Sequence, residues 1–200
     1  MDATTVIILV LAVVIIAAIA VAVWFYLQKQ RTSHLRAKFG PEYSRAVRAE
    51  GDTKHAEQVL EQRQQRVNKL NITALSAGQR NEFAQAWEKE QARFVDDPSN
   101  AVNNADRLVR RVMETRGYPV SDFEQRVADI SVDHPVVVEN YRVAHAVAAR
   151  TRDQQVSTEE LRTAMIHYRA LFADLLKDGR GRPVSDVMRA DNTRARSAGR

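Results

Sequence analysis

The chain has 200 residues, with 30 basic and 25 acidic side chains and a net charge of +5. It contains no cysteine, which excludes disulfide bonds, thiolate catalysis and thiolate metal sites. The length is sufficient for one membrane-spanning segment and one domain with a hydrophobic core.

The first element in chain order is an apolar segment over residues 6–27, which contains no charge, proline or glycine. A helix of 22 residues is about 33 Å long, close to the roughly 30 Å of a bilayer's hydrocarbon core. A cleaved signal peptide is the alternative. It calls for a basic start and a shorter apolar stretch, whereas this chain begins with Met-Asp-Ala-Thr-Thr. We therefore expect an uncleaved transmembrane helix preceded by a short extracytoplasmic N-terminus, residues 1–5.

The end of this segment has the composition of a membrane interface. Three aromatic residues close the apolar run, and basic residues follow at once in a juxtamembrane segment over residues 28–48. The positive-inside rule then predicts an outer N-terminus and a cytoplasmic domain in a bacterial inner membrane. The same basic residues could also contact anionic lipid. The predicted interface residues are Trp24, Phe25, Tyr26, Lys29, Arg31, Arg36 and Lys38.

Charge is distributed unevenly along the rest of the chain. Residues 28–48 hold six basic side chains against one glutamate, and residues 177–200 hold seven basic and three acidic side chains. The central residues 49–176 carry a net charge of −3. Nucleic-acid-binding domains usually carry their positive charge on the folded body, so this distribution argues against nucleic acid as a partner.

Helix signals dominate the soluble part from its start. Gly40-Pro41-Glu42 predicts a helix start, and Asp52 predicts the cap of the next helix. Apolar spacing after Asp52 indicates a helical hairpin arm or a short coiled coil, carried by Ala56, Leu60, Arg63, Val67 and Leu70. Ser76–Gln79 has the form of a capping box before a helix with Phe83, Trp87 and Phe94 along one side.

Further start and stop signals follow at short intervals. Asp97-Pro98 predicts a capped start, and Gly117 with Pro119 predicts the end of that helix. Ser121–Glu124 and Ser157–Glu160 predict two more capping boxes, and Asp133 predicts the start of the helix between them. The hydrophobic period agrees with these signals, so we predict an all-α fold: the transmembrane helix, a five- to seven-helix domain over 49–176, and a disordered basic tail over 177–200.

Few residues indicate catalysis or metal binding. His134 and His145 lie 11 residues apart, a rise of about 16 Å on a helix, so they cannot share one metal ion. His145 is interpreted as a core histidine, Asp97 as a cap and Asp106 as part of a solvated face. Asp129, Asp133 and His134 form the one polar corner in which acid–base chemistry is conceivable. No nucleophile motif or phosphate-binding glycine loop accompanies them, so we expect no cofactor and no metal.

Three stretches carry a resemblance to known sequences: residues 36–43 (RAKFGPEY), 92–98 (ARFVDDP) and 131–145 (SVDHPVVVENYRVAH). There the chain resembles a family of uncharacterised bacterial proteins with a short N-terminal membrane segment and a helical domain. The likeness runs from about residue 31 to residue 176. It implies a bacterial source and a compact domain, but no activity or catalytic residue. Some members are labelled secreted, which conflicts with the orientation predicted from the flanking charges.

These observations predict a membrane-anchored interaction or scaffold domain, with the bilayer and a membrane-associated protein as partners. One alternative is a ligand-sensing bundle with a pocket among its aromatic helices. A second is a membrane-tethered enzyme that uses the corner of Asp129, Asp133 and His134. A polar cavity would favour the sensor, and convergent acids and histidine in one cleft would favour the enzyme.

Overall fold

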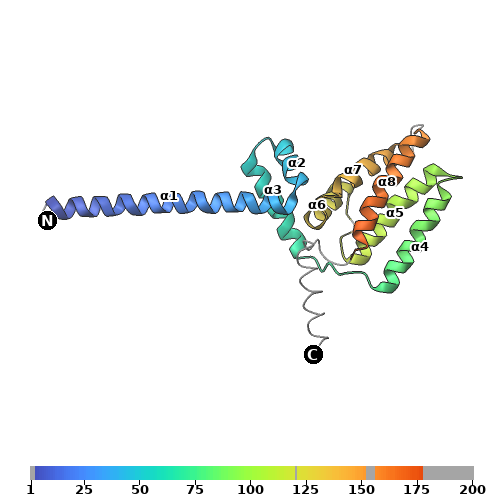
Figure 1. Ribbon diagram of the computed structural model, residues 1–200, viewed down its shortest axis with the longest axis horizontal. Helices are drawn as coiled ribbons and strands as arrows, with labels where there is room; N and C mark the ends of the chain where they lie inside the picture. The colour runs from blue at the N-terminus through green and yellow to red at the C-terminus, as the bar shows by residue number, and fades with distance from the viewer. Residues whose placement is uncertain (1–2, 120, 152–155, 178–200) are drawn as a thin grey trace, which may run out of the picture. The chain divides into compact units, whose positions relative to one another are not determined.

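The computed structural model describes residues 3–119, 121–151 and 156–177. Within these ranges the chain forms eight α-helices and no strand (Figure 1), which confirms the predicted all-α class. The chain divides into two compact units, residues 1–60 and 61–200, and the boundary falls inside one helix, α3. The tail predicted over 177–200 lies outside the described residues except for Lys177.

The first unit contains α1 (Ala3–Phe39), α2 (Pro41–Glu50) and the beginning of α3 (Thr53–Asn68). Gly40 separates α1 from α2 with a φ of 48°, and Pro41 opens α2 as its position predicts. Asp52 Oδ2 accepts the His55 N–H at 2.8 Å, which confirms the predicted cap of α3. The Tyr43 hydroxyl donates to Glu57 Oε1 at 2.8 Å and joins α2 to α3.

The second unit contains the remaining helices, α4 (Ala77–Arg93), α5 (Pro98–Arg116), α6 (Phe123–Asp133), α7 (Val138–Arg150) and α8 (Thr158–Leu175). α8 packs against both α5 and α7, while α4 packs on α5 and α6 on α7. Trp87 of α4 and Phe172 of α8 stack with ring centroids 4.8 Å apart. With α3, the described part of residues 49–176 holds six helices, within the predicted five to seven.

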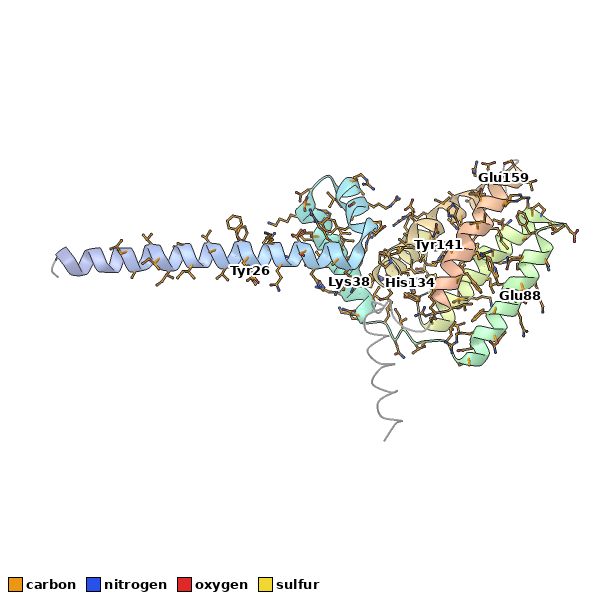
Figure 2. All side chains as sticks on the ribbon, viewed as in Figure 1. Tyr26, Lys38, Glu88, His134, Tyr141 and Glu159 are labelled. Atoms are coloured by element: carbon orange, nitrogen blue, oxygen red, sulfur yellow. The ribbon has the colours of Figure 1, made fainter. Side chains whose placement is uncertain are left out.

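The stripe predicted on α3 is buried at Ala56, Leu60 and Val67, but a coiled coil stays a prediction. Figure 2 shows where two side chains of the second unit lie, Tyr141 between the helices and Glu159 at their outer edge. Tyr141 has no exposed surface, whereas the Glu159 side chain is 76% exposed.

Helix caps follow the predicted signals at several positions. Ser76 with Gln79 and Ser157 with Glu160 form complete capping boxes, and Asp97 caps α5. Gly117 ends α5 with a φ of 97°. A Cβ at Gly117 would lie 2.3 Å from the Asn71 carbonyl oxygen, so the connection before α4 can approach the end of α5 only because this residue is glycine.

Two predicted helix starts are wrong. α6 is capped by Asp122 rather than Ser121, since the Asp122 carboxylate accepts the Gln125 N–H at 2.8 Å and a carboxylate is the stronger acceptor at a helix N-terminus. Asp133 does not start α7 but is the last residue of α6, and α7 begins at Val138. His134 precedes a proline, which disfavours helical backbone there and ends α6.

Candidate functional site

The apolar run lies within α1, a helix of 37 residues. The described side chains from Leu11 to Leu27 are exposed on every side of this helix. Among the described residues, α1 is the one helix long and apolar enough to cross a membrane, by length and composition, and an N-terminal signal sequence would meet the same criteria. Apolar surface of this extent is unstable in water and requires a nonpolar environment.

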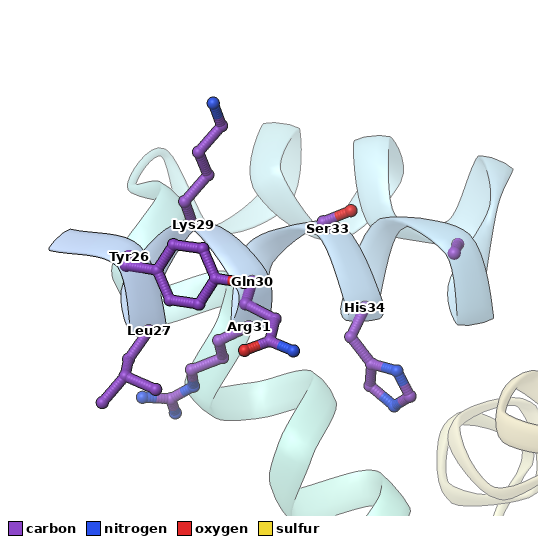
Figure 3. A pocket seen from close by; sticks show the side chains of 8 residues that line it. Tyr26, Leu27, Lys29, Gln30, Arg31, Ser33 and His34 are labelled. Atoms are coloured by element: carbon purple, nitrogen blue, oxygen red, sulfur yellow. The ribbon is translucent and has the colours of Figure 1, made fainter. Parts of the chain in front are cut away.

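The predicted interface residues all lie on the C-terminal half of α1. Trp24 and Phe25 pack edge to face, with ring centroids 5.0 Å apart. Figure 3 shows an open hollow along this part of α1, with Tyr26 and Leu27 at one end and Lys29, Arg31 and His34 farther along. The aromatic and basic residues therefore follow one another along one continuous helix.

A second group of functional candidates lies where three helices end. α5 ends at Arg116, α6 at Asp133 and α8 at Leu175. We call Arg116, His134, Asp174 and the Leu175 carbonyl the C-terminal cluster. Arg116 Nη1 donates to the Leu175 carbonyl at 2.9 Å and lies 3.4 Å from His134 Nε2. A guanidinium at these helix ends compensates their partial negative charge.

The hydrogen bonds of His134 define its role in the C-terminal cluster. Its Nδ1 lies 2.7 Å from Asp174 Oδ2, so a proton on Nδ1 leaves Nε2 free to accept from Arg116. Hydrogen bonding from His134 is the main cause that lowers the pKa of Asp174 to about 2, against the opposing effect of burial. Arg116 is 1% exposed and His134 is 4% exposed, whereas the Asp174 side chain is 25% exposed at the edge of the cluster. The cluster is therefore largely buried and acts as a structural contact among the three helices.

The three residues of the predicted polar corner, Asp129, Asp133 and His134, have different hydrogen-bond partners in the structure. Asp133 accepts the Tyr118 hydroxyl at 2.9 Å, while His134 belongs to the C-terminal cluster. Asp129 Oδ1 pairs with Arg66 Nε at 3.1 Å. Burial raises the pKa of Asp129 despite hydrogen bonds from Gln125 and Arg66, and its Oδ2 has no hydrogen-bond partner among the described residues. Each of the three side chains thus has its own structural partner.

The sequence interpretation of Asp106 as part of a solvated face is wrong. It is 8% exposed, not on a solvated face, and its Oδ1 accepts the Tyr168 hydroxyl at 2.9 Å. His145 Nδ1 lies 3.3 Å from the same oxygen, and Arg110 Nε lies 3.2 Å from Oδ2. Burial alone would raise the pKa of Asp106, but the hydrogen bonds from His145 and Tyr168 and the nearby charges lower it overall.

The imidazole of His145 is held between Asp106 and Phe123, whose ring centroid lies 3.8 Å away. His145 is interpreted from the sequence as a core histidine that is hydrogen-bonded to a neighbour. The hydrogen bond is present, but the side chain is 26% exposed, so His145 lies at the edge of the core rather than inside it. A carboxylate–imidazole pair can transfer protons, but the hydrogen-bond and ring partners of His145 are Asp106, Phe123 and Tyr141, and they include no serine, threonine or cysteine. No group of three potential metal ligands occurs in the part of the chain that the structure describes.

Comparison with known proteins assigns no family or function to this chain. No protein-family model, curated protein or solved structure matches this chain.

Proposed function

We propose that α1 anchors this protein in a bacterial inner membrane and that its helical domain is a protein-binding scaffold at the cytoplasmic surface. The observation that carries the proposal is the exposure of apolar side chains around α1 from Leu11 to Leu27. A helix that is apolar on every side is normally buried in protein or in lipid. The described part of the protein covers none of this segment, so lipid is the environment that it fits.

The flanking charges support an outer N-terminus. Asp2 is the only charged side chain before the apolar run, whereas Lys29, Arg31, Arg36 and Lys38 follow it. Basic residues close to a membrane-spanning helix favour the cytoplasmic side. Anchoring would raise the effective concentration of the domain for partners on the same membrane.

Binding is favoured over catalysis by the arrangement of polar side chains in the second unit. Asp106, Asp133 and Asp174 each accept a hydrogen bond from a residue of the same unit. Trp87 and Phe172 stack on one another, which favours a core role over the walls of a sensor pocket.

The orientation is tested by single cysteines at Ala3 and Val95 in a chain that has no other cysteine. Val95 is 83% exposed, so its thiol would be accessible without disturbing the core. A membrane-impermeant maleimide added to intact cells should label the Ala3 site and spare the Val95 site until the cells are opened. Labelling of Val95 in intact cells would place the domain on the outer side. Release of the full chain by alkaline carbonate would contradict the anchor itself.

The scaffold role is tested by photo-crosslinking in native membranes. A photoreactive amino acid is placed at Val136 or Ile166, which are 75% and 61% exposed, or at buried Leu171 as the control. A scaffold should give a discrete protein adduct from at least one exposed position and none from Leu171. Absence of adducts from every exposed position sampled around the domain would contradict the proposal.

A further inference from the structure

A cavity of about 490 Å³ opens in the first unit beside α2. Its lining includes the guanidinium-bearing side chains of Arg36 and Arg48 and the hydroxyl-bearing side chains of Ser44 and Thr53. Ser44 and Arg48 are four residues apart on α2 and so lie on the same face of that helix. The cavity therefore gathers two positively charged side chains and the hydroxyl groups of Ser44 and Thr53 from three successive helices.

The two arginines differ in how they are held. The Arg36 guanidinium lies over the Tyr43 ring, 5.1 Å from its centroid, and this cation–π contact restrains it at the cavity wall. Arg48 makes no hydrogen bond or ion pair within the part of the chain that the structure describes, and its side chain is exposed. One guanidinium is thus positioned in advance, and the other is available to close on a ligand.

Two acidic groups of the first unit already have partners. Glu57 accepts the Tyr43 hydroxyl at 2.8 Å and is 3% exposed. Glu50 pairs with His55 at 3.2 Å. Neither carboxylate is among the lining residues, so the charge presented to a ligand in the cavity is that of the two arginines.

We propose that this cavity binds a phosphate-bearing anion. Guanidinium groups match the geometry of phosphate oxygens, and the hydroxyls of Ser44 and Thr53 can donate further hydrogen bonds. Arg36 lies nine residues beyond Leu27, which is about 13 Å along the helix. A headgroup layer is only about 6 Å deep on each side of a bilayer, so a soluble phosphate compound reaches the cavity more readily than an ordinary lipid phosphate.

The experiment uses the full chain in nanodiscs of phosphatidylcholine, titrated with inorganic pyrophosphate and followed by calorimetry. We expect saturable binding with one site per chain. The Arg36→Gln/Arg48→Gln variant should bind about tenfold more weakly or worse, since it loses two charge-assisted contacts. Arg48→Gln alone should also weaken binding, and it leaves the contact between Arg36 and Tyr43 in place.

The matched control is Lys89→Gln/Arg169→Gln, which removes the same charge from exposed positions of α4 and α8. This variant should bind pyrophosphate as the unmodified protein does. Equal weakening in both double variants would overturn the site, because it would show a response to net charge alone.

A second experiment tests whether the bound phosphate group belongs to a lipid headgroup. This possibility rests on the proposed function of α1 as a membrane anchor. Phosphatidic acid is added to the nanodiscs, and its headgroup signal is followed by phosphorus NMR. A shift that depends on Arg36 and Arg48, without pyrophosphate binding, would identify a lipid headgroup as the source. If the protein binds neither pyrophosphate nor phosphatidic acid, the proposal is overturned. Thiol labelling reports the topology independently, so failure of this site and failure of the anchor remain distinguishable.

Discussion

α1 and α5 both carry apolar side chains, but they differ in how many they carry and in where these side chains lie. In α5 the apolar residues lie on one side, and Ala101, Val109 and Val112 have no exposed surface. In α1 they surround the helix, and Ile15 and Ile16 are 57% and 66% exposed. α5 is packed by α4, α7 and α8. The described part of α1 has no such cover between Leu11 and Leu27.

The difference shows that the number of apolar residues and their arrangement together decide which environment a helix requires. A one-sided stripe can be buried by neighbouring helices while the opposite side stays in water. An apolar helix without a polar side has no face that water solvates well. The stability of α5 therefore depends on protein packing, and we propose that the stability of α1 depends on lipid.

The largest expected effect comes from charging α1. Val13→Arg with Ile16→Arg places two guanidinium groups near the middle of the apolar run, at an expected cost of about 5–7 kcal/mol for insertion. The variant should move from the membrane pellet to the soluble or aggregated fraction, as measured by carbonate extraction. Arg107→Ala with Arg111→Ala, on exposed positions of α5, should leave the membrane fraction unchanged. If the charged α1 variant stays entirely in the membrane pellet, the proposed difference between α1 and α5 is contradicted.

Packing of the second unit is tested at Trp87, which is 5% exposed and stacks on Phe172. Trp87→Ala should reduce the free energy of unfolding by about 3–5 kcal/mol, because it leaves a cavity between α4 and α8. Urea denaturation of the full chain in detergent, followed by circular dichroism, measures the change. Val95→Ala, at an exposed position, should cost less than about 0.5 kcal/mol. A loss below about 1 kcal/mol for Trp87→Ala would mean that this ring is not a core residue.

Substitution of two glycines of the second unit tests the close approach of the backbone at Asn71 to Gly117. Gly117→Ala combines a positive φ with a Cβ against the Asn71 carbonyl, so we expect a loss of about 1–3 kcal/mol or more. Gly78 lies inside α4, where an added Cβ would meet only Ser76 Oγ, at 3.9 Å. Gly78→Ala should therefore stabilise by about 0.5–1 kcal/mol. Thermal unfolding of both variants should give shifts of opposite sign, and equal shifts would contradict the close approach at Gly117.

A pH-dependent effect is expected at Asp174, whose pKa is held at about 2, below its ordinary value of 3.8. A carboxylate with a lowered pKa in the folded state adds stability above the pKa of the unfolded state. This stability is lost as the pH falls from about 4 to about 2. Asp174→Asn should cost about 1–2 kcal/mol at pH 7, and the difference from the unmodified protein should shrink over that interval. Glu159→Gln, at an exposed position, should cost less than about 0.5 kcal/mol at every pH.

Signals that act within a few residues predicted the fold well. Ser76 and Ser157 cap helices because their hydroxyls and the acceptors three residues later satisfy local N–H groups, whatever the distant chain does. The errors at Ser121 and Asp133 arose where two polar residues compete for one cap, or where a proline limits the preceding residue rather than opening a helix.

Sites built from distant residues were predicted poorly. The polar corner was inferred from the closeness of Asp129, Asp133 and His134 in sequence, yet the partner of His134 lies 40 residues away, at Asp174. Asp106 was assigned to a solvated face, and only the approach of α7 and α8 shows that it accepts hydrogen bonds from His145 and Tyr168. The burial of Arg116 has no local signal either, since an arginine in the last turn of a helix is usually exposed.

α1 does not end with its apolar run but continues without a break for twelve residues past Leu27, to Phe39. That extension is about 18 Å of helix, in which each residue turns by about 100°. With α1 as the anchor, the link from the bilayer to Gly40 is a stiff shaft rather than a flexible tether. A tilt or rotation of the shaft within the lipid would be transmitted to Gly40 with little loss. The length of the shaft would set the height at which α2 begins, and its helical phase would set the direction in which the chain departs.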